Sequence, residues 1–254
     1  MILRDVEAIT PDALLALISS ADSVDPAFSL TGDLPLDAQA RSIVETCGFD
    51  DLVAGLKAGE KSARRGFATT ALGDARRGAN ADAKLAHEIV ERVCSMAAVP
   101  YHPVSYSNLI ECMTNTNNHA GKPGSIRWRV MATCDPAARV VRFVFADPGD
   151  GICRTAMRRF VQVGSDAVLL ETLLDPKTNG FRKLLAGAPY KTRTGKPGRG
   201  RGLRKIAQSF QRGHLRRIVV AANRGYTELG GTTTSKELPK PGFRGTLLYW
   251  DFAY

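Results

Sequence analysis

The chain has 254 residues, a hydrophobic content of 44% and a formal net charge of +10 at neutral pH. These values indicate a soluble globular chain that buries a sizeable core, as one large domain or as a small domain followed by a larger one. No run approaches the ~18 apolar residues of a membrane helix, and the amino terminus is not a basic start followed by an apolar stretch. We therefore expect a cytoplasmic protein with no membrane partner.

The positive charge is concentrated in one segment. Residues 176–227 contain 14 Lys or Arg and no Asp or Glu, whereas the rest of the chain has 21 basic and 25 acidic residues. Such a segment favours a local site for phosphates, nucleic acid or an acidic protein partner. The alternative is a solvated face that keeps the protein in solution. Basic charge alone attracts any nucleic acid regardless of its base sequence, so it does not identify a specific partner.

The cysteines predict neither a disulfide framework nor a zinc site. They are odd in number and widely separated, with no C-x-x-C pair, so we expect buried free thiols. The five are Cys47, Cys94, Cys112, Cys134 and Cys153.

The first eighty residues predict a small α/β N-terminal domain and a junction. Thr10 followed by Pro11 is typical of a helix start, and a second helix is predicted over 36–47, before Gly48. Residues 57–80 are rich in Gly, Ala and Arg, which indicates a loop, an edge strand or a domain junction. Residues 34–48 weakly resemble STAS-like domains.

Residues 81–254 predict a second domain. Apolar residues at helical spacing predict helices over 83–98 and 107–120. Two β-branched runs, 126–132 and 139–145, predict antiparallel strands joined by a turn at Asp135-Pro136. Further strands are predicted over 215–221 and 246–252.

The helix over 107–120 carries a polar face. At about 100° per residue, Glu111, Asn115 and Asn118 fall on one side. The other sides carry Leu109, Cys112, Met113 and Thr116. Alone, this pattern is equally typical of a solvated stripe on an amphipathic helix.

A second motif follows the strand predicted over 139–145. The sequence Asp147-Pro-Gly-Asp-Gly-Ile152 has glycines that let the backbone turn tightly and approach a ligand. The alternative is an ordinary turn whose carboxylates bond neighbouring amides.

A third motif is a glycine-rich basic loop, residues 194–202, that leads into an amphipathic helix. A loop of this kind offers bare amides and the positive end of the helix dipole to phosphate. A flexible basic linker and a nucleic-acid-binding tail are the alternatives, but the apolar pattern that follows favours an ordered helix. Its members are Leu203, Ile206, Ala207 and Phe210.

In this order the three motifs resemble the boxes of the GHKL superfamily, which includes histidine kinases, type II topoisomerase and mismatch-repair ATPases, the ninety-kilodalton chaperone and anti-sigma serine kinases. The N-box is 111–120, the first glycine box 147–152 and the second glycine box 198–203. Gly245-Thr246 is similar to the closing glycine-threonine element. The resemblance covers about residues 105–250.

The resemblance implies a role for each box in binding ATP and Mg²⁺. Glu111 would be the general base, Asn115 the Mg²⁺ ligand and Asp147 the acceptor for the adenine amino group, supported by Thr246. The other implied ATP-binding residues are Asn118 and His119 near phosphate, Gly149, Gly151 and Ile152 around the base, and Lys196, Gly198, Arg199, Gly200, Arg201, Gly202 and Leu203 in the lid over the phosphates.

The resemblance further implies a Bergerat-type fold, a two-layer α/β sandwich in which a mixed, mainly antiparallel sheet carries helices on one face. The implied function is a magnesium-dependent kinase acting on a protein or nucleic-acid acceptor. Two alternatives stay open: a slow ATPase that gates a partner surface, and a nucleotide-responsive binding module without turnover. A cognate regulatory protein is a further candidate partner, and the oligomeric state is open.

Overall fold

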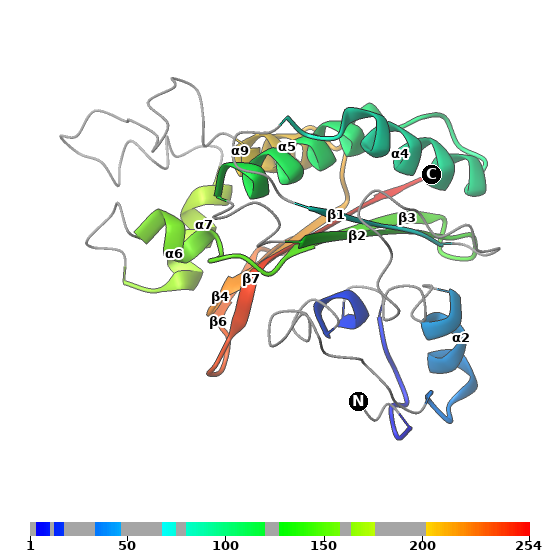
Figure 1. The fold of residues 1–254 in the computed structure, drawn as a ribbon, viewed down its shortest axis with the longest axis horizontal. Coiled ribbons are helices and arrows are strands. Elements are labelled where there is room, and N and C mark those ends of the chain that lie inside the picture. The colour runs from blue at the N-terminus through cyan, green and yellow to red at the C-terminus, as the bar shows by residue number, and fades with distance from the viewer. Residues whose placement is uncertain are drawn as a thin grey trace.

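The computed structural model describes residues 4–10, 13–17, 34–46, 68–74, 80–119, 127–157, 164–175 and 202–254. Their fold is α+β, with helices packed on an open sheet (Figure 1). The helices are α2 (Ala38–Thr46), α4 (Ala83–Met96), α5 (Pro103–His119), α6 (Ile152–Met157), α7 (Asp166–Leu174) and α9 (Gly202–Gln211). The strands are β1 (Ala68–Asp74), β2 (Arg127–Asp135), β3 (Val140–Asp147), β4 (Arg217–Asn223), β5 (Gly225–Leu229), β6 (Thr234–Glu237) and β7 (Phe243–Ala253).

The seven strands form one sheet in the order β1-β2-β3-β7-β4-β5-β6. All six described pairings are antiparallel, so the expectation of a mixed sheet is wrong for these strands. The reason is the position of β7, the last strand in the chain, which lies between β3 and β4 and runs opposite to both. β3 and β4 therefore point the same way without touching as neighbours.

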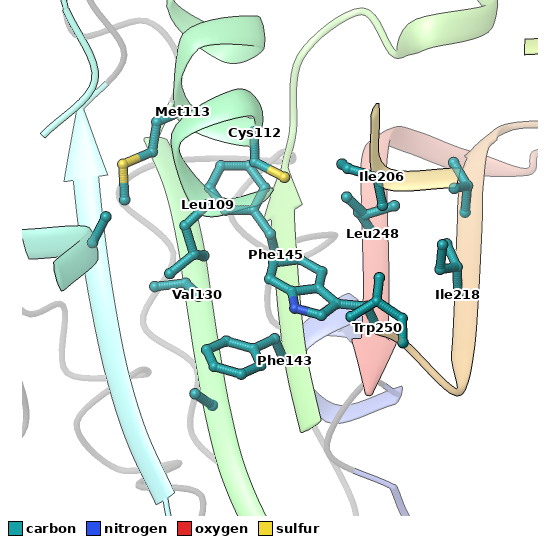
Figure 2. Close-up of a cluster of buried hydrophobic side chains, with 14 of the residues drawn as sticks. Leu109, Cys112, Met113, Val130, Phe143, Phe145, Ile206, Ile218, Leu248 and Trp250 are labelled. Carbon is teal, nitrogen blue, oxygen red and sulfur yellow. The ribbon is translucent and has the colours of Figure 1, made fainter. Parts of the chain in front are cut away.

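One face of the sheet is covered by α4, α5 and α9, while α6 and α7 lie at one end (Figure 1). Leu109, Cys112 and Met113 point from α5 toward the sheet residues of this core (Figure 2). The Phe143 and Trp250 rings stack on neighbouring strands with centroids 5.2 Å apart. The packing of α5 and α9 on this apolar core fixes both helices relative to the ends of β3 and β7, where the candidate site lies.

The opposite face is covered by helices from the N-terminal part of the chain, which lie outside residues 81–254, the range for which helices on one face were expected. Leu14, Leu15 and Val44 are fully buried in one apolar cluster with sheet residues of β2, β3, β4 and β7. α2 lies on this face, opposite α4 and α5 (Figure 1). Sequence periodicity showed that these helices have an apolar side, but it carried no information about which surface that side would cover.

Several local predictions are confirmed. The Thr10 hydroxyl accepts the Ala13 N–H at 3.4 Å, as a helix start requires. β2 and β3 pair around the turn at Asp135, whose carboxylate accepts the Ala138 N–H at 2.9 Å. β1 is an edge strand within the ambiguous segment 57–80, and it pairs with β2 although it precedes the boundary predicted at residue 80.

Cys94, Cys112, Cys134 and Cys153 are buried free thiols, and Cys47 lies outside the described residues. Among the residues that the structure describes, no helix has the length and apolar character needed to cross a membrane.

His102 caps α5, the helix that carries the polar face. Its Nδ1 accepts the Ser105 N–H at 3.2 Å and lies 2.8 Å from the Ser105 hydroxyl, directly before the proline at the first helical position. The imidazole stacks on Phe252 with ring centroids 3.8 Å apart. Burial, aided by the charge of His214, lowers the pKa of His102 to about 4.

The cap makes stability depend on pH. Because the folded-state pKa of His102 lies below its ordinary value of 6.5, the neutral ring stabilises the fold fully above pH 6.5, and this contribution is lost as the pH falls toward 4. We expect His102→Asn to be less stable than wild type at pH 7.5 by roughly 1 kcal/mol. The loss is small because the ring is only partly buried, so solvent weakens its interactions. The difference should shrink as the pH approaches 4.5 in urea titrations.

The matched control is His87→Asn, since His87 is exposed on α4. This variant removes an imidazole outside the cap, so its urea midpoints measure the effect of losing a histidine alone. A constant offset between His102→Asn and wild type across this pH range would contradict the assignment of His102 as a neutral cap.

Candidate functional site

The polar face of α5 has the predicted placement. Glu111, Asn115 and Asn118 are half-buried in one continuous helix, whereas Leu109 and Met113 are buried in the core. His119 is the last helical residue. Because this polar face lies at the edge of the apolar core, the side chains of Glu111, Asn115 and Asn118 are each partly exposed to solvent and partly packed against other residues.

Asp147, at the end of β3, is buried with only 7% of its surface exposed. Its Oδ1 accepts the Gly149 N–H at 3.0 Å, and its Oδ2 accepts from the Thr116 hydroxyl on α5 at 3.4 Å. Burial raises the pKa of Asp147 to about 6, and these two hydrogen bonds offset part of that effect. The carboxylate is thus a buried acceptor at the junction of α5 and β3.

The strand pairing brings Thr246 opposite Asp147. Thr246 on β7 is buried and pairs in register with Asp147, and its hydroxyl accepts the Ile152 N–H at 3.2 Å. Gly245 has φ +97, and a Cβ there would lie 1.8 Å from the Asp147 carbonyl oxygen. Only glycine permits this approach of the two backbones.

The first glycine box is held in place by β4. Asn223 Nδ2 donates to the Asp150 carbonyl at 2.9 Å, and Asn223 Oδ1 accepts the Arg154 N–H at 3.1 Å. Gly151 has φ +81, and a Cβ there would lie 2.5 Å from Asn223 Oδ1. The Asn223 side chain therefore holds this turn in place, and only a glycine at position 151 leaves room for that side chain.

The first turn of α9 meets the candidate base. A Cβ on Gly202 would lie 3.0 Å from Glu111 Oε2, and Lys205 forms an ion pair with Glu111 Oε1. Leu203 is half-buried and packs against the core. The other predicted lid residues lie outside the described residues: Lys196, Gly198, Arg199, Gly200 and Arg201.

Three residues of this site escaped the sequence interpretation. Thr116 was assigned to the sides of α5 away from the polar face, yet its hydroxyl contacts Asp147. Asn223 acts across 73 residues, a separation that no local pattern reveals. Lys205 had a weak signal, because it lies three residues after Gly202 on a predicted helix and such residues are neighbours on a helix surface.

These features define an α+β protein in which α5 contacts the buried carboxylate of Asp147 at the ends of β3 and β7, and also contacts the first turn of α9 through Glu111. No protein-family model, curated protein or solved structure matches the chain.

Burial of Asp147 has a stability cost that a substitution should reveal. Its folded-state pKa of about 6 lies above the ordinary value of 3.8, so the ionised form destabilises the fold above pH 6 and this cost disappears as the pH falls toward 4. We expect Asp147→Asn to be more stable than wild type at pH 8 by about 2 kcal/mol, and close to wild type at pH 4. Urea midpoints at the two pH values test this.

Asp150→Asn is the control, because Asp150 is exposed three residues further along. It should leave the difference between pH 8 and pH 4 unchanged. If Asp147→Asn were less stable than wild type at pH 8, the carboxylate would instead be a net stabilising group.

Proposed function

We propose that residues 81–254 form a Bergerat-type ATP-binding domain and that the protein is a magnesium-dependent phosphotransferase acting on a protein or nucleic-acid acceptor. The observation that carries the proposal is the convergence of the motifs. Thr116 in the N-box segment contacts Asp147, Thr246 lies opposite Asp147, and Gly202 lies against Glu111. Four segments that resemble separate GHKL elements thus meet at two points, Asp147 and Glu111, and α5 takes part in both.

Asp147 suits the adenine end of such a site. An adenine amino group donates hydrogen bonds, and a buried carboxylate is an acceptor whose strength is increased by the low dielectric around it. Gly149, whose N–H bonds Asp147, has no side chain, so a flat base beside Asp147 would meet backbone there. This end of the site provides recognition of the base.

The N-terminus of α9 suits the phosphate end. A helix of ten residues begins at Gly202, and its first N–H groups and dipole favour an anion. The basic sequence before it adds positive charge, as the composition of residues 176–227 shows. Phosphates bound here would lie beside Glu111, because Glu111 contacts the same helical turn.

The residues present also fit Mg²⁺. The described ranges contain no cluster of three or more His, Cys, Asp or Glu that could hold a metal ion, but Mg²⁺ at a nucleotide needs only one or two protein ligands beside phosphates and water. Asn115, one turn from Glu111 and half-buried, offers an amide oxygen of the required kind. When bound, Mg²⁺ would offset phosphate charge.

Glu111 is the proposed general base. Its carboxylate would accept the proton of the attacking acceptor hydroxyl while a new bond forms between that oxygen and the γ-phosphorus. The bond from the γ-phosphorus to the β–γ bridging oxygen breaks, and ADP leaves with that electron pair. If water attacks instead, the same chemistry gives a slow ATPase, the second form of this proposal.

The decisive experiment follows γ-labelled ATP with magnesium, using wild type and Glu111→Ala. We expect wild type to transfer label to a protein or RNA acceptor, and Glu111→Ala to bind ATP within a fewfold of wild type while losing at least about a hundredfold in turnover, a magnitude typical of a missing general base. Asp147→Asn should instead weaken ATP binding.

The matched control is Glu45→Gln, since Glu45 is exposed on α2, on the opposite face of the sheet. It should behave as wild type. Free phosphate without labelled macromolecule would favour the ATPase, binding without turnover in wild type would leave only the binding module, and no binding by wild type would refute the proposal.

A further inference from the structure

The Glu111 carboxylate lies against a single turn of α9. Oε1 forms the ion pair with Lys205, and Oε2 is the atom closest to the position of a Cβ on Gly202. Gly202 and Lys205 are three residues apart, so they lie side by side on the helix surface. The Glu111 carboxylate therefore faces the N-terminal turn of α9, where it meets the Lys205 ammonium group and the backbone of Gly202.

The helix that supplies these contacts is fixed to the core. Ile206 and Ala207, directly after Lys205, are buried with 2% and 0% exposure. The backbone of Lys205 therefore has one position relative to α5, and the ammonium group reaches Glu111 from it. The pair bridges the helix of the N-box and the helix that follows the second glycine box.

The ion pair between Lys205 and Glu111 contributes little to the stability of the fold. The Lys205 side chain is 62% exposed and that of Glu111 24% exposed. Ion pairs in such surroundings contribute little to folding, because water screens the charges and two long side chains lose conformational freedom. What the pair does fix is the direction of one carboxylate.

We propose that Lys205 is a positioning residue that holds the Glu111 carboxylate against the first turn of α9, ready to accept a proton beside bound phosphates. This role rests on the proposed function. Lys205 acts through Glu111 and need not contact the nucleotide.

The role predicts a separation of binding from turnover. Lys205→Met keeps the length of the side chain and removes the charge, so Glu111 would sample several rotamers, few of them productive. We expect kcat for ATP turnover to fall about tenfold while KM for ATP stays within about twofold. Lys205→Arg, which retains a cation able to pair with a carboxylate, should restore at least half of the wild-type kcat.

The matched control is Arg212→Met, because Arg212 is an exposed cation just after the end of α9. It should leave kcat and KM unchanged. Urea titrations of the three variants should agree with wild type, so a change in turnover could not come from partial unfolding.

Four results would overturn the inference while leaving the proposed function standing. An unchanged or increased kcat in Lys205→Met would show that the pair is idle or restrains the base. A raised KM with unchanged kcat would make Lys205 a phosphate ligand. An equal loss in Arg212→Met would show a general charge effect, and a kcat of Lys205→Arg as low as that of Lys205→Met would exclude rescue by a cation. Absence of turnover in wild type would instead refute the proposed function, and this role with it.

Discussion

The insertion of β7 between β3 and β4 is the constraint on which the candidate site depends. Thr246 pairs with Asp147 on one side and with Ala222 on the other, so one residue sets the register of three strand ends. The close approach of Gly245 to the Asp147 carbonyl leaves no room for a slip that would place a side chain there. The glycine box, the buried carboxylate and Asn223 are all positioned by this pairing.

The two carboxylates of the site have different surroundings. Asp147 is buried and accepts from an N–H and a hydroxyl, whereas Glu111 is partly exposed and paired with a lysine. Environments that differ in this way give chemically identical groups different tasks. A buried, fixed acceptor suits recognition, and a partly exposed carboxylate held by one lysine suits proton transfer.

The sequence predicted most of the elements on which this site is built. Strong periodicity gave α4, α5 and α9, and two β-branched runs gave β2 and β3. The strands predicted over 215–221 and 246–252 correspond to β4 and β7 to within a few residues. It missed α6, which has only 6 residues, α7, and the β5–β6 hairpin, whose outer strand is only 4 residues long and mostly exposed. Elements of that kind are defined by the neighbours they pack against, and a local pattern carries little of that information.

The residues of the candidate site fall into the same two groups: those that a local sequence pattern reveals and those that it does not. Residues within a motif, such as Glu111 and Asp147, stand out because unusual residue types recur at a spacing that a helix or turn explains. Asn223 and Lys205 do not, because their importance lies in contacts that close only when β4 meets the glycine box and α9 meets α5. Long-range contacts of this type need the tertiary structure.

The apolar cluster on the second face of the sheet has a practical consequence. Met131, Val144 and Tyr249 are covered from the amino-terminal part of the chain, by Leu14, Leu15 and Val44. A fragment cut at residue 81 would expose this surface to water and would leave β2, without β1, as a bare edge. Exposed apolar faces and open edges promote self-association. Such a truncation, although it keeps every residue with a proposed role, is a poor choice for expression and crystallisation.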